Sequence, residues 1–190
     1  MPIEFEKQYD QERFLFEVVG PRFQRQGWLT AYDLFSIVRW KANRAISKVA
    51  NSLVRISGFG LEQTSRELTR DIFNARDHHE RFLVARGKWK LRLPMASAIL
   101  TVLFPDAFTV YDVRACEMLG DFSNLAGKAN LESRWQGYVA FMDAIKRSTP
   151  ANLSLRDKDR YLWARSRHDG LMHFVKRDFS VRAPRTTTSK

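Results

Sequence analysis

The sequence predicts an all-α protein of eight or nine helices. Along the chain of 190 residues, apolar side chains recur at the three- and four-residue spacing of amphipathic helices rather than at the alternation of strands. Two capping boxes, Thr30–Asp33 and Ser154–Asp157, mark helix starts, and the sequence contains no repeats and no convincing strand pair. A chain of this length can bury a sizeable core without a disulfide or metal.

The first capping box opens a predicted helix of about six turns. Its apolar stripe runs from Ala31 to Leu53 at helical period. Two glycines around Phe59 are expected to end this stretch, and shorter helices are predicted at 64–75 and 77–85.

The middle of the chain is expected to supply the centre of the core. A basic connector at 86–92 precedes Pro94, which fits the first turn of a helix. The helix at 95–104 is apolar nearly all round, so it is expected to be buried. Pro105 ends it, and residues 108–112 are expected to approach the next helix in an extended form.

The last third predicts three more helices. An apolar stripe at 131–145 forms one, and the second capping box opens another, which Gly170 is expected to divide from a final helix ending near Phe179. Residues 181–190 are polar and basic and are expected to be disordered. Residues 1–180 are therefore predicted to form a single domain.

The charge of the chain predicts a polyanionic partner. There are 32 Lys and Arg residues against 21 Asp and Glu, a net charge of +11, and nucleic acid is the most plausible polyanion. Residues 76–92 carry six basic and two acidic side chains, and residues 156–190 carry ten and four. Two interpretations of these segments stay open. They either neutralise phosphates, with salt-sensitive affinity as the consequence, or form a basic surface that only keeps the protein soluble.

Other features predict a cytoplasmic, nucleoid-associated monomer without cofactors. The single Cys116 cannot form an internal disulfide, and the N-terminus lacks a secretory pattern. The longest near-apolar run is about half of a membrane span. Phosphate-loop and dinucleotide motifs are missing. His78 and His79 point about 100° apart on a helix, so no metal site is predicted.

Residues 93–114, LPMASAILTVLFPDAFTVYDVR, resemble the core of the helix-hairpin-helix DNA glycosylases, in particular bacterial 8-oxoguanine DNA glycosylase-like proteins. In that family a small-residue-rich apolar helix runs through a short turn into an Asp at the start of the next helix. Pro94 to Asp112 aligns with this pattern without gaps. The resemblance implies a glycosylase-like bundle, in two lobes with a cleft, that flips a damaged base (an oxidised purine, for example) from double-stranded DNA and hydrolyses its N-glycosidic bond.

The chain departs from the family at the hairpin. The family's Gly-x-Gly core, whose backbone N–H groups hold a phosphate, is replaced by Lys90-Leu-Arg92, and the side chains of Lys88, Lys90 and Arg92 are the hypothetical substitute. Pro94 occupies the position of the nucleophilic lysine of bifunctional members. A monofunctional enzyme is therefore expected, and Lys90 or Lys88 remains a lyase candidate only in a reshaped hairpin.

Asp112 is the predicted catalytic residue. Cleavage of an N-glycosidic bond builds positive charge on the sugar, which a fixed carboxylate stabilises while it orients or deprotonates water. A helix N-terminus keeps such a carboxylate ionised. The alternative is an Asp that only caps the next helix. Arg114, where family members often carry His, is expected to contact phosphate or to hold the carboxylate ionised.

Two tryptophans are candidates for contact with DNA. Trp40 falls on the helix face opposite the apolar stripe, where it packs against a second helical layer or lines a base pocket. Trp89, flanked by Lys88 and Lys90, suits stacking or wedging at a phosphate backbone. Burial of the Trp89 ring in the core is an equally weighted alternative.

Two other functions stay open. A basic all-α DNA-binding protein could keep the fold without catalysis, as the missing Gly-x-Gly and lysine suggest. An RNA-binding or defence-associated protein is a weaker alternative, which would prefer another polymer.

Overall fold

The structure, a computed structural model, describes residues 9–127 and 130–177. Helix accounts for 76% of these residues and none of them is in a strand, which confirms the all-α class. The α-helices are α1 (Gln11–Phe14), α2 (Gly20–Gln26), α3 (Ala31–Ala42), α4 (Ile46–Ser57), α5 (Leu61–Asn74), α6 (His78–Leu83), α7 (Leu93–Leu103), α8 (Val113–Leu119), α9 (Leu131–Arg147) and α10 (Leu155–Val175).

Short irregular turns lie between some of these helices. A π turn at Leu15–Val19 connects α1 to α2, a 3-10 turn at Asn43–Ala45 connects α3 to α4, and a second π turn at Val84–Lys88 extends α6. A further 3-10 turn covers Leu125–Gly127. Eight of the ten α-helices of the described residues, α2 to α5 and α7 to α10, have seven or more residues, which is within the predicted number.

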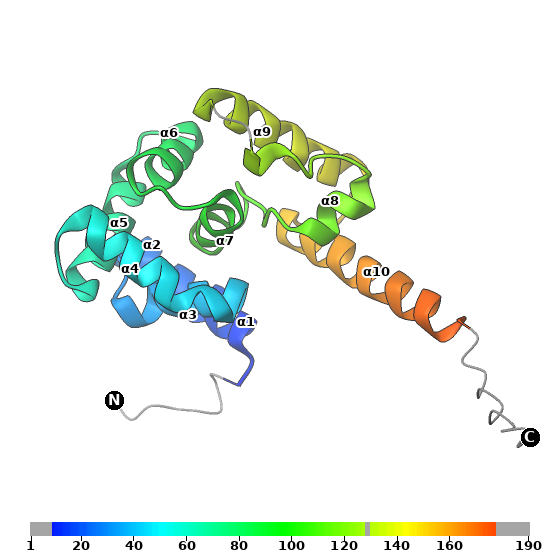
Figure 1. Cartoon of the computed structure of the whole chain (residues 1–190), viewed down its shortest axis with the longest axis horizontal. Helices are drawn as coiled ribbons and strands as arrows, with labels where there is room; N and C mark the ends of the chain where they lie inside the picture. The colour runs from blue at the N-terminus through cyan, green and yellow to red at the C-terminus, as the bar shows by residue number, and fades with distance from the viewer. Residues whose placement is uncertain (1–8, 128–129, 178–190) are drawn as a thin grey trace, which may run out of the picture.

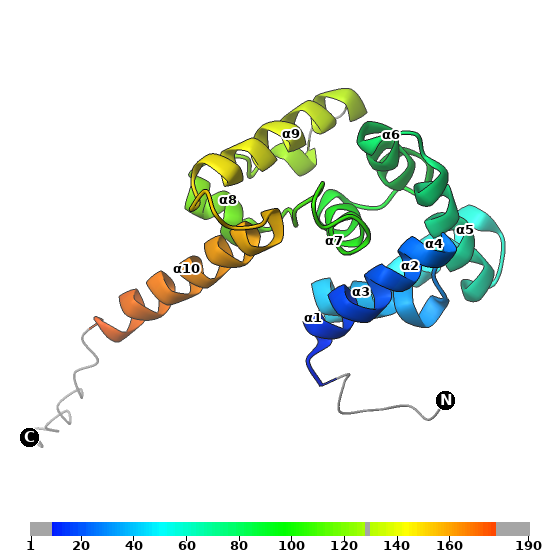
Figure 2. The same ribbon diagram turned by 180° about the vertical axis from the view of Figure 1, so that it is seen from behind.

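Helix α7 is the centre of the fold, as its all-round apolar sequence predicts. Ten of its eleven residues are buried, with Pro94 the exception. Helices α1 to α5 lie on one side of α7 and α8 to α10 on the other (Figure 1). The view from behind shows the same arrangement, with the C-terminal half of α10 projecting from the body (Figure 2).

Both capping boxes begin helices where the sequence predicts them. The Thr30 hydroxyl accepts a hydrogen bond from the Asp33 N–H at 3.1 Å, and the Ser154 hydroxyl accepts one from the Asp157 N–H at 3.1 Å. The Asp33 carboxylate is also buried, and it pairs with Arg22 at 2.7 Å. This ion pair ties α2 to α3.

The prediction of one unbroken helix across residues 31–53 is wrong. Ala42 leaves the helical conformation, with φ −159° and ψ 80°, and the 3-10 turn that follows redirects the chain. This break allows α4 to pack against both α3 and α5. The second half runs to Ser57, where Gly58, one of the two glycines expected to end it, does so with a φ of 76°.

The predicted division at Gly170 is also wrong, because α10 runs through it to Val175. A single glycine inside a helix costs only about 1 kcal/mol, and no capping residue follows to begin a new helix. The predicted end near Phe179 and the tail at 181–190 lie outside the described residues.

Gly20 is expected to be intolerant of any side chain. A Cβ at this position would lie 2.7 Å from the carbonyl oxygen of Val102, which is backbone of the central helix α7. We expect Gly20→Ala to lower the free energy of unfolding by about 1–3 kcal/mol, measured by urea denaturation. Gly170→Ala is the matched control: a Cβ there meets nothing within 4 Å, so a gain of about 0.5–1 kcal/mol is expected. Equal effects of the two substitutions would contradict this account.

Candidate functional site

The segment that leads to Asp112 belongs to no helix or strand, Asp112 itself has the predicted extended backbone (φ −135°, ψ 145°), and two helices hold the segment in place. The backbone N–H of Thr109 donates to the hydroxyl of Tyr138 in α9 at 3.2 Å, and that hydroxyl donates to the Thr109 carbonyl at 2.5 Å. Two residues on, the Tyr111 N–H donates to the hydroxyl of Ser97 in α7 at 2.9 Å. The backbone leading to Asp112 is therefore fixed from both sides.

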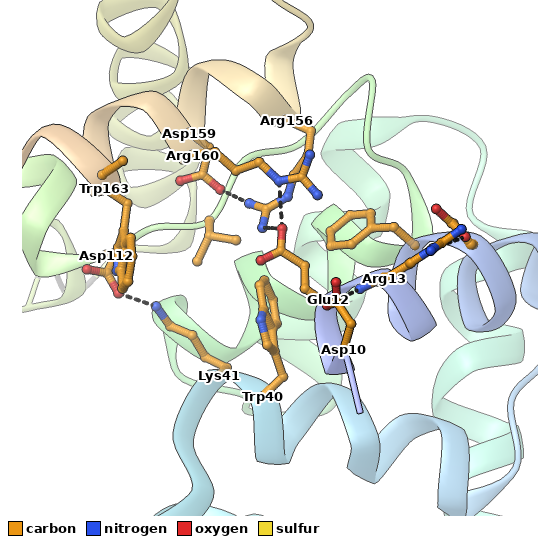
Figure 3. A pocket seen from close by; sticks show the side chains of 14 residues that line it. Asp10, Glu12, Arg13, Trp40, Lys41, Asp112, Arg156, Asp159, Arg160 and Trp163 are labelled. Atoms are coloured by element: carbon orange, nitrogen blue, oxygen red, sulfur yellow. Dashed lines mark hydrogen bonds and ion pairs between the residues drawn. The ribbon is translucent and has the colours of Figure 1, made fainter. Parts of the chain in front are cut away.

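Asp112 caps α8 and also forms an ion pair. One carboxylate oxygen accepts the N–H of Arg114 at 3.0 Å, which confirms the predicted N-cap. The other accepts a hydrogen bond from Lys41 Nζ at 2.6 Å, across 71 residues of sequence (Figure 3). Partial burial opposes ionisation of this carboxyl, but the charge and hydrogen bond of Lys41, with the N–H of Arg114, outweigh burial and lower the pKa of Asp112.

Asp112 and Lys41 line a cavity of about 750 Å³. This volume lies within the usual range of small-ligand pockets, about 300–1,000 Å³. The cavity walls include three aromatic side chains, Phe16, Trp40 and Trp163. The rings of Phe16 and Trp40 meet edge to face, with centroids 6.0 Å apart. Trp40 thus combines both expectations of the sequence, since it packs against a second layer and also faces a cavity.

A network of charges closes one wall between the N-terminal and C-terminal helices. Glu12 in α1 accepts hydrogen bonds from Arg156 at 2.5 Å and from Arg160 at 2.7 Å, both in α10. Arg156 also pairs with Asp159, and its guanidinium carbon lies 4.7 Å from the centroid of Phe16. Figure 3 shows how this group faces the cavity across from Asp112.

Asp159 has a pKa raised to about 6. Burial is the main cause, and the nearby Asp112 charge adds to it, while the charges of Arg156 and Lys41 and a backbone hydrogen bond from Val110 act in the opposite direction. The two carboxyl groups of the cavity therefore differ: Asp112 ionises more readily than a free aspartate and Asp159 less readily. Such separation of neighbouring pKa values is characteristic of sites that use one group as a base and another as an acid.

The raised pKa of Asp159 predicts a pH-dependent difference in stability. The folded protein binds the Asp159 proton more tightly than the unfolded chain, so ionisation between about pH 4 and 6 weakens the fold. Asp159→Asn cannot ionise, and it should gain on the order of 2 kcal/mol relative to the wild type as the pH rises through this window. Thermal unfolding of both proteins from pH 4 to 8 measures the difference in their stability. A stability difference that stays constant with pH would refute the raised pKa of Asp159.

The hairpin residues are separate from this cavity. Lys88, Trp89, Lys90 and Arg92 lie between α6 and α7, and none of them lines it. The structure buries the Trp89 ring, which is only 3% exposed, and its indole N–H donates to Asp71 at 2.7 Å. Of the two alternatives for this ring, packing in the core is the one observed, and no aromatic wedge is presented there.

The backbone of the hairpin adopts an unusual conformation at Lys90. Its φ of 52° is in the left-handed region, which favours glycine. Lys90 and Arg92 are exposed and form no ion pair within the described residues, whereas Lys88 pairs with Asp71 at 2.7 Å. Of the three cations predicted to bind phosphate, two are therefore unneutralised.

Arg114 is exposed at the start of α8. Its guanidinium carbon lies 5.8 Å from the ring centroid of Trp163, which lines the cavity. It helps to hold Asp112 ionised chiefly through its backbone N–H, with a smaller contribution from its charge.

Sequence reasoning missed Lys41 and Glu12, and for Asp159 it favoured a solvated helix face over a place in a cleft. Lys41 directly follows Trp40 but belongs to no recognisable sequence motif. The alternating charges of residues 156–160 favoured a solvated face, yet Asp159 lies four residues after Leu155 and three before Leu162 on the buried stripe of α10. A carboxylate on an apolar stripe is the signal that could have revealed it. Nothing local marks Glu12.

The chain was compared with known proteins, and its described residues were searched for metal sites and membrane spans. No protein-family model matches this chain, and searches of curated proteins and of solved structures also found no match. Among residues 9–127 and 130–177, no group of three or more His, Cys, Asp or Glu side chains is arranged to hold a metal ion. Within the same residues, no helix has the length and apolar character needed to cross a bilayer.

Proposed function

We propose that this protein is a DNA glycosylase of the helix-hairpin-helix type. It would bind double-stranded DNA, flip a damaged base into the cavity between α3 and α10, and hydrolyse the N-glycosidic bond. The observation that carries the proposal is Asp112: an ionised carboxylate at a helix N-terminus that opens onto a cavity with aromatic walls. This is the carboxylate that the family resemblance assigns to catalysis.

The cavity offers the groups that base release requires. Asp112 can stabilise the positive charge that develops on the deoxyribose and orient the attacking water. Trp40, Phe16 and Trp163 offer aromatic surfaces for an extruded base. Asp159, whose pKa of about 6 keeps part of it protonated near neutral pH, is positioned in the same cavity to donate a proton to the leaving base.

The hairpin supports the same proposal. Lys90 stands where the family has the first glycine of its Gly-x-Gly, and its backbone takes a left-handed conformation that glycine favours, which supports the proposal of a phosphate-binding turn here. The exposed cations of Lys90 and Arg92 are the proposed phosphate contacts. The oxidised-purine substrate, the two-lobed bundle and nucleoid association rest on the resemblance alone.

Base release from defined duplexes tests the proposal. Wild-type protein is incubated with duplexes containing 8-oxoguanine, uracil, an alkylated adenine or adenine opposite 8-oxoguanine, and abasic products are revealed by alkaline cleavage. Release from any one of them supports a glycosylase and names its lesion. Salt-sensitive binding to all four without release would favour the non-enzymatic DNA-binding alternative, and a preference for RNA would favour neither.

A further inference from the structure

The C-terminal part of α10 projects from the packed body of the protein. This part, residues 163–177, is called the arm below, and Figures 1 and 2 both show it pointing away from the other helices. None of its residues is buried. Its large apolar side chains are exposed, Leu171 by 60%, Met172 by 42%, Phe174 by 53% and Val175 by 64%. Exposed apolar side chains gathered on one element are typical of an interaction surface.

The two halves of α10 present apolar side chains to opposite sides. In the first half Leu162 is buried in the core. Leu171 follows it by nine residues, about two and a half helical turns, so the two side chains point in opposite directions. A ridge at intervals of four residues therefore faces away from the core: Trp163, Arg167, Leu171 and Val175. Because Trp163 also lines the cavity, the ridge begins at the cavity and continues outward along the arm.

The arm is strongly basic. It contains four basic side chains, Arg165, Arg167, Lys176 and Arg177, and a single acidic one, Asp169. Asp169 pairs with Arg165 at 3.7 Å, and the other three cations form no ion pair within the described part of the chain. An apolar ridge with unneutralised cations beside it is complementary to an apolar surface that carries carboxylates.

We propose that the arm binds an acidic amphipathic helix of a partner protein. The apolar face of that helix packs along Leu171 and Val175, and Asp or Glu side chains at its edges pair with Arg167 and Lys176. Helices commonly recognise each other through an apolar stripe flanked by opposite charges. This interaction does not depend on the proposed function, but it places the partner beside the cavity, because the ridge begins at Trp163.

Other occupants fit the arm less well. A second copy of this chain would bring the same cations together on both helices, which is repulsive. Phosphates of a nucleic acid would neutralise the cations, but phosphate contacts are polar and leave Leu171 and Val175 without a role. A helix that lies in a membrane surface keeps its apolar face free of charge, whereas Arg167 lies within the ridge. An acidic helix is complementary to both the ridge and its cations.

Fluorescence anisotropy with two labelled synthetic peptides tests the proposal on the full-length protein. Both peptides contain three heptads with Leu at two positions of each, spaced three and four residues apart. The acidic peptide carries Glu at the positions flanking this stripe, and the basic peptide carries Lys there. We expect the acidic peptide to bind at least about 10-fold more tightly than the basic one, and to bind more weakly as salt rises. Amide hydrogen exchange of the wild type should slow within residues 163–177 when the acidic peptide is bound.

Two double variants separate the apolar and the charged contributions. Leu171→Ala with Val175→Ala should weaken binding of the acidic peptide by at least about 10-fold, and it keeps the helix because Ala has the highest helix propensity. Arg167→Gln with Lys176→Gln should weaken binding by about 2–10-fold and reduce its salt dependence.

The matched controls are exposed residues of α4, which lies away from the arm (Figure 1). Ile56→Ala controls for the loss of an apolar side chain, and Lys48→Gln with Arg55→Gln controls for the loss of two charges. Both control proteins should bind the acidic peptide as the wild type does.

Several results would overturn the proposal. Equal affinity for the two peptides would do so, as would binding of neither, or binding that Leu171→Ala with Val175→Ala leaves unchanged. A wild-type dimer in sedimentation that this variant abolishes would identify a second copy as the occupant. Protection of the arm by duplex DNA or by phosphatidylserine vesicles, and not by the acidic peptide, would identify a polyanion instead. Because hydrogen exchange is measured on the wild type, the test does not require any variant to fold. Leu171 and Val175 do not line the cavity, so base release tests the glycosylase proposal separately.

Discussion

Asn in place of Asp112 is expected to reduce base release by about 10²–10⁴-fold on any lesion that the wild type processes. The substitution removes the negative charge that stabilises the sugar cation and the acceptor that orients water. It keeps the helix cap, because Asn caps as well as Asp does, and a carbonyl oxygen can still accept the Arg114 N–H. The rate is measured under single-turnover conditions with excess protein.

Asp77→Asn is the matched control for this variant. Asp77 caps α6, accepts the Glu80 N–H at 2.8 Å and does not line the cavity. Both variants remove one negative charge, so both should bind undamaged duplex at least as tightly as the wild type. Base release that survives in Asp112→Asn, or falls equally in Asp77→Asn, would show that Asp112 is only a structural cap.

Loss of the Tyr138 side chain is expected to cost the most stability. Tyr138 is fully buried, its ring stacks with Phe82 at 5.6 Å, and its hydroxyl holds both polar groups of the Thr109 backbone. Tyr138→Ala should lower the free energy of unfolding by about 3–5 kcal/mol from the lost ring alone. Tyr138→Phe isolates the hydroxyl and should cost about 1–3 kcal/mol, because the Thr109 N–H and carbonyl stay buried without this partner.

Urea denaturation of both variants measures these effects, with Tyr161→Phe as the control, since Tyr161 is exposed and lies in the more peripheral α10. Tyr138→Phe has a second consequence for the site, because the Thr109 backbone leads directly to Asp112. Base release per folded molecule should fall in Tyr138→Phe and stay unchanged in Tyr161→Phe. Wild-type stability in Tyr138→Phe would mean that the hydroxyl does not fix this segment.

Local signals predicted the parts of the fold that depend on neighbouring residues. The caps at Thr30, Ser154 and Asp112 and the buried helix after Pro94 all depend on the chemistry of a few consecutive residues. The failures arose where tertiary packing decides. Local propensity does not reveal the turn after Ala42, which redirects α4 across α3 and α5. At Gly170 the prediction of a helix break overestimated the cost of one glycine, which is small enough for a helix to continue through it.

The sequence predicted Asp112, the central residue of the candidate site, but not most of the side chains that surround it. Asp112 and Trp40 were singled out from sequence and do share one cavity. The hairpin cations do not reach that cavity. Lys41, the lysine that lines it, lies 71 residues from Asp112 in the sequence. Pairings of this kind arise when α3 and α8 meet in three dimensions, and a single sequence carries no record of which distant side chains will face each other.

The ion pairs of Glu12 with α10 have a consequence for the order in which the protein matures. Glu12 and Arg156 are separated by 144 residues, and a ribosome delivers the chain from its N-terminus. Helices α1 to α7 leave the exit tunnel while α10 is still unmade, so the nascent protein can surround α7 before its cavity has a second wall. The complete cavity is thus acquired last, and a chain truncated before Ser154 would keep Asp112 but lack the wall that α10 supplies.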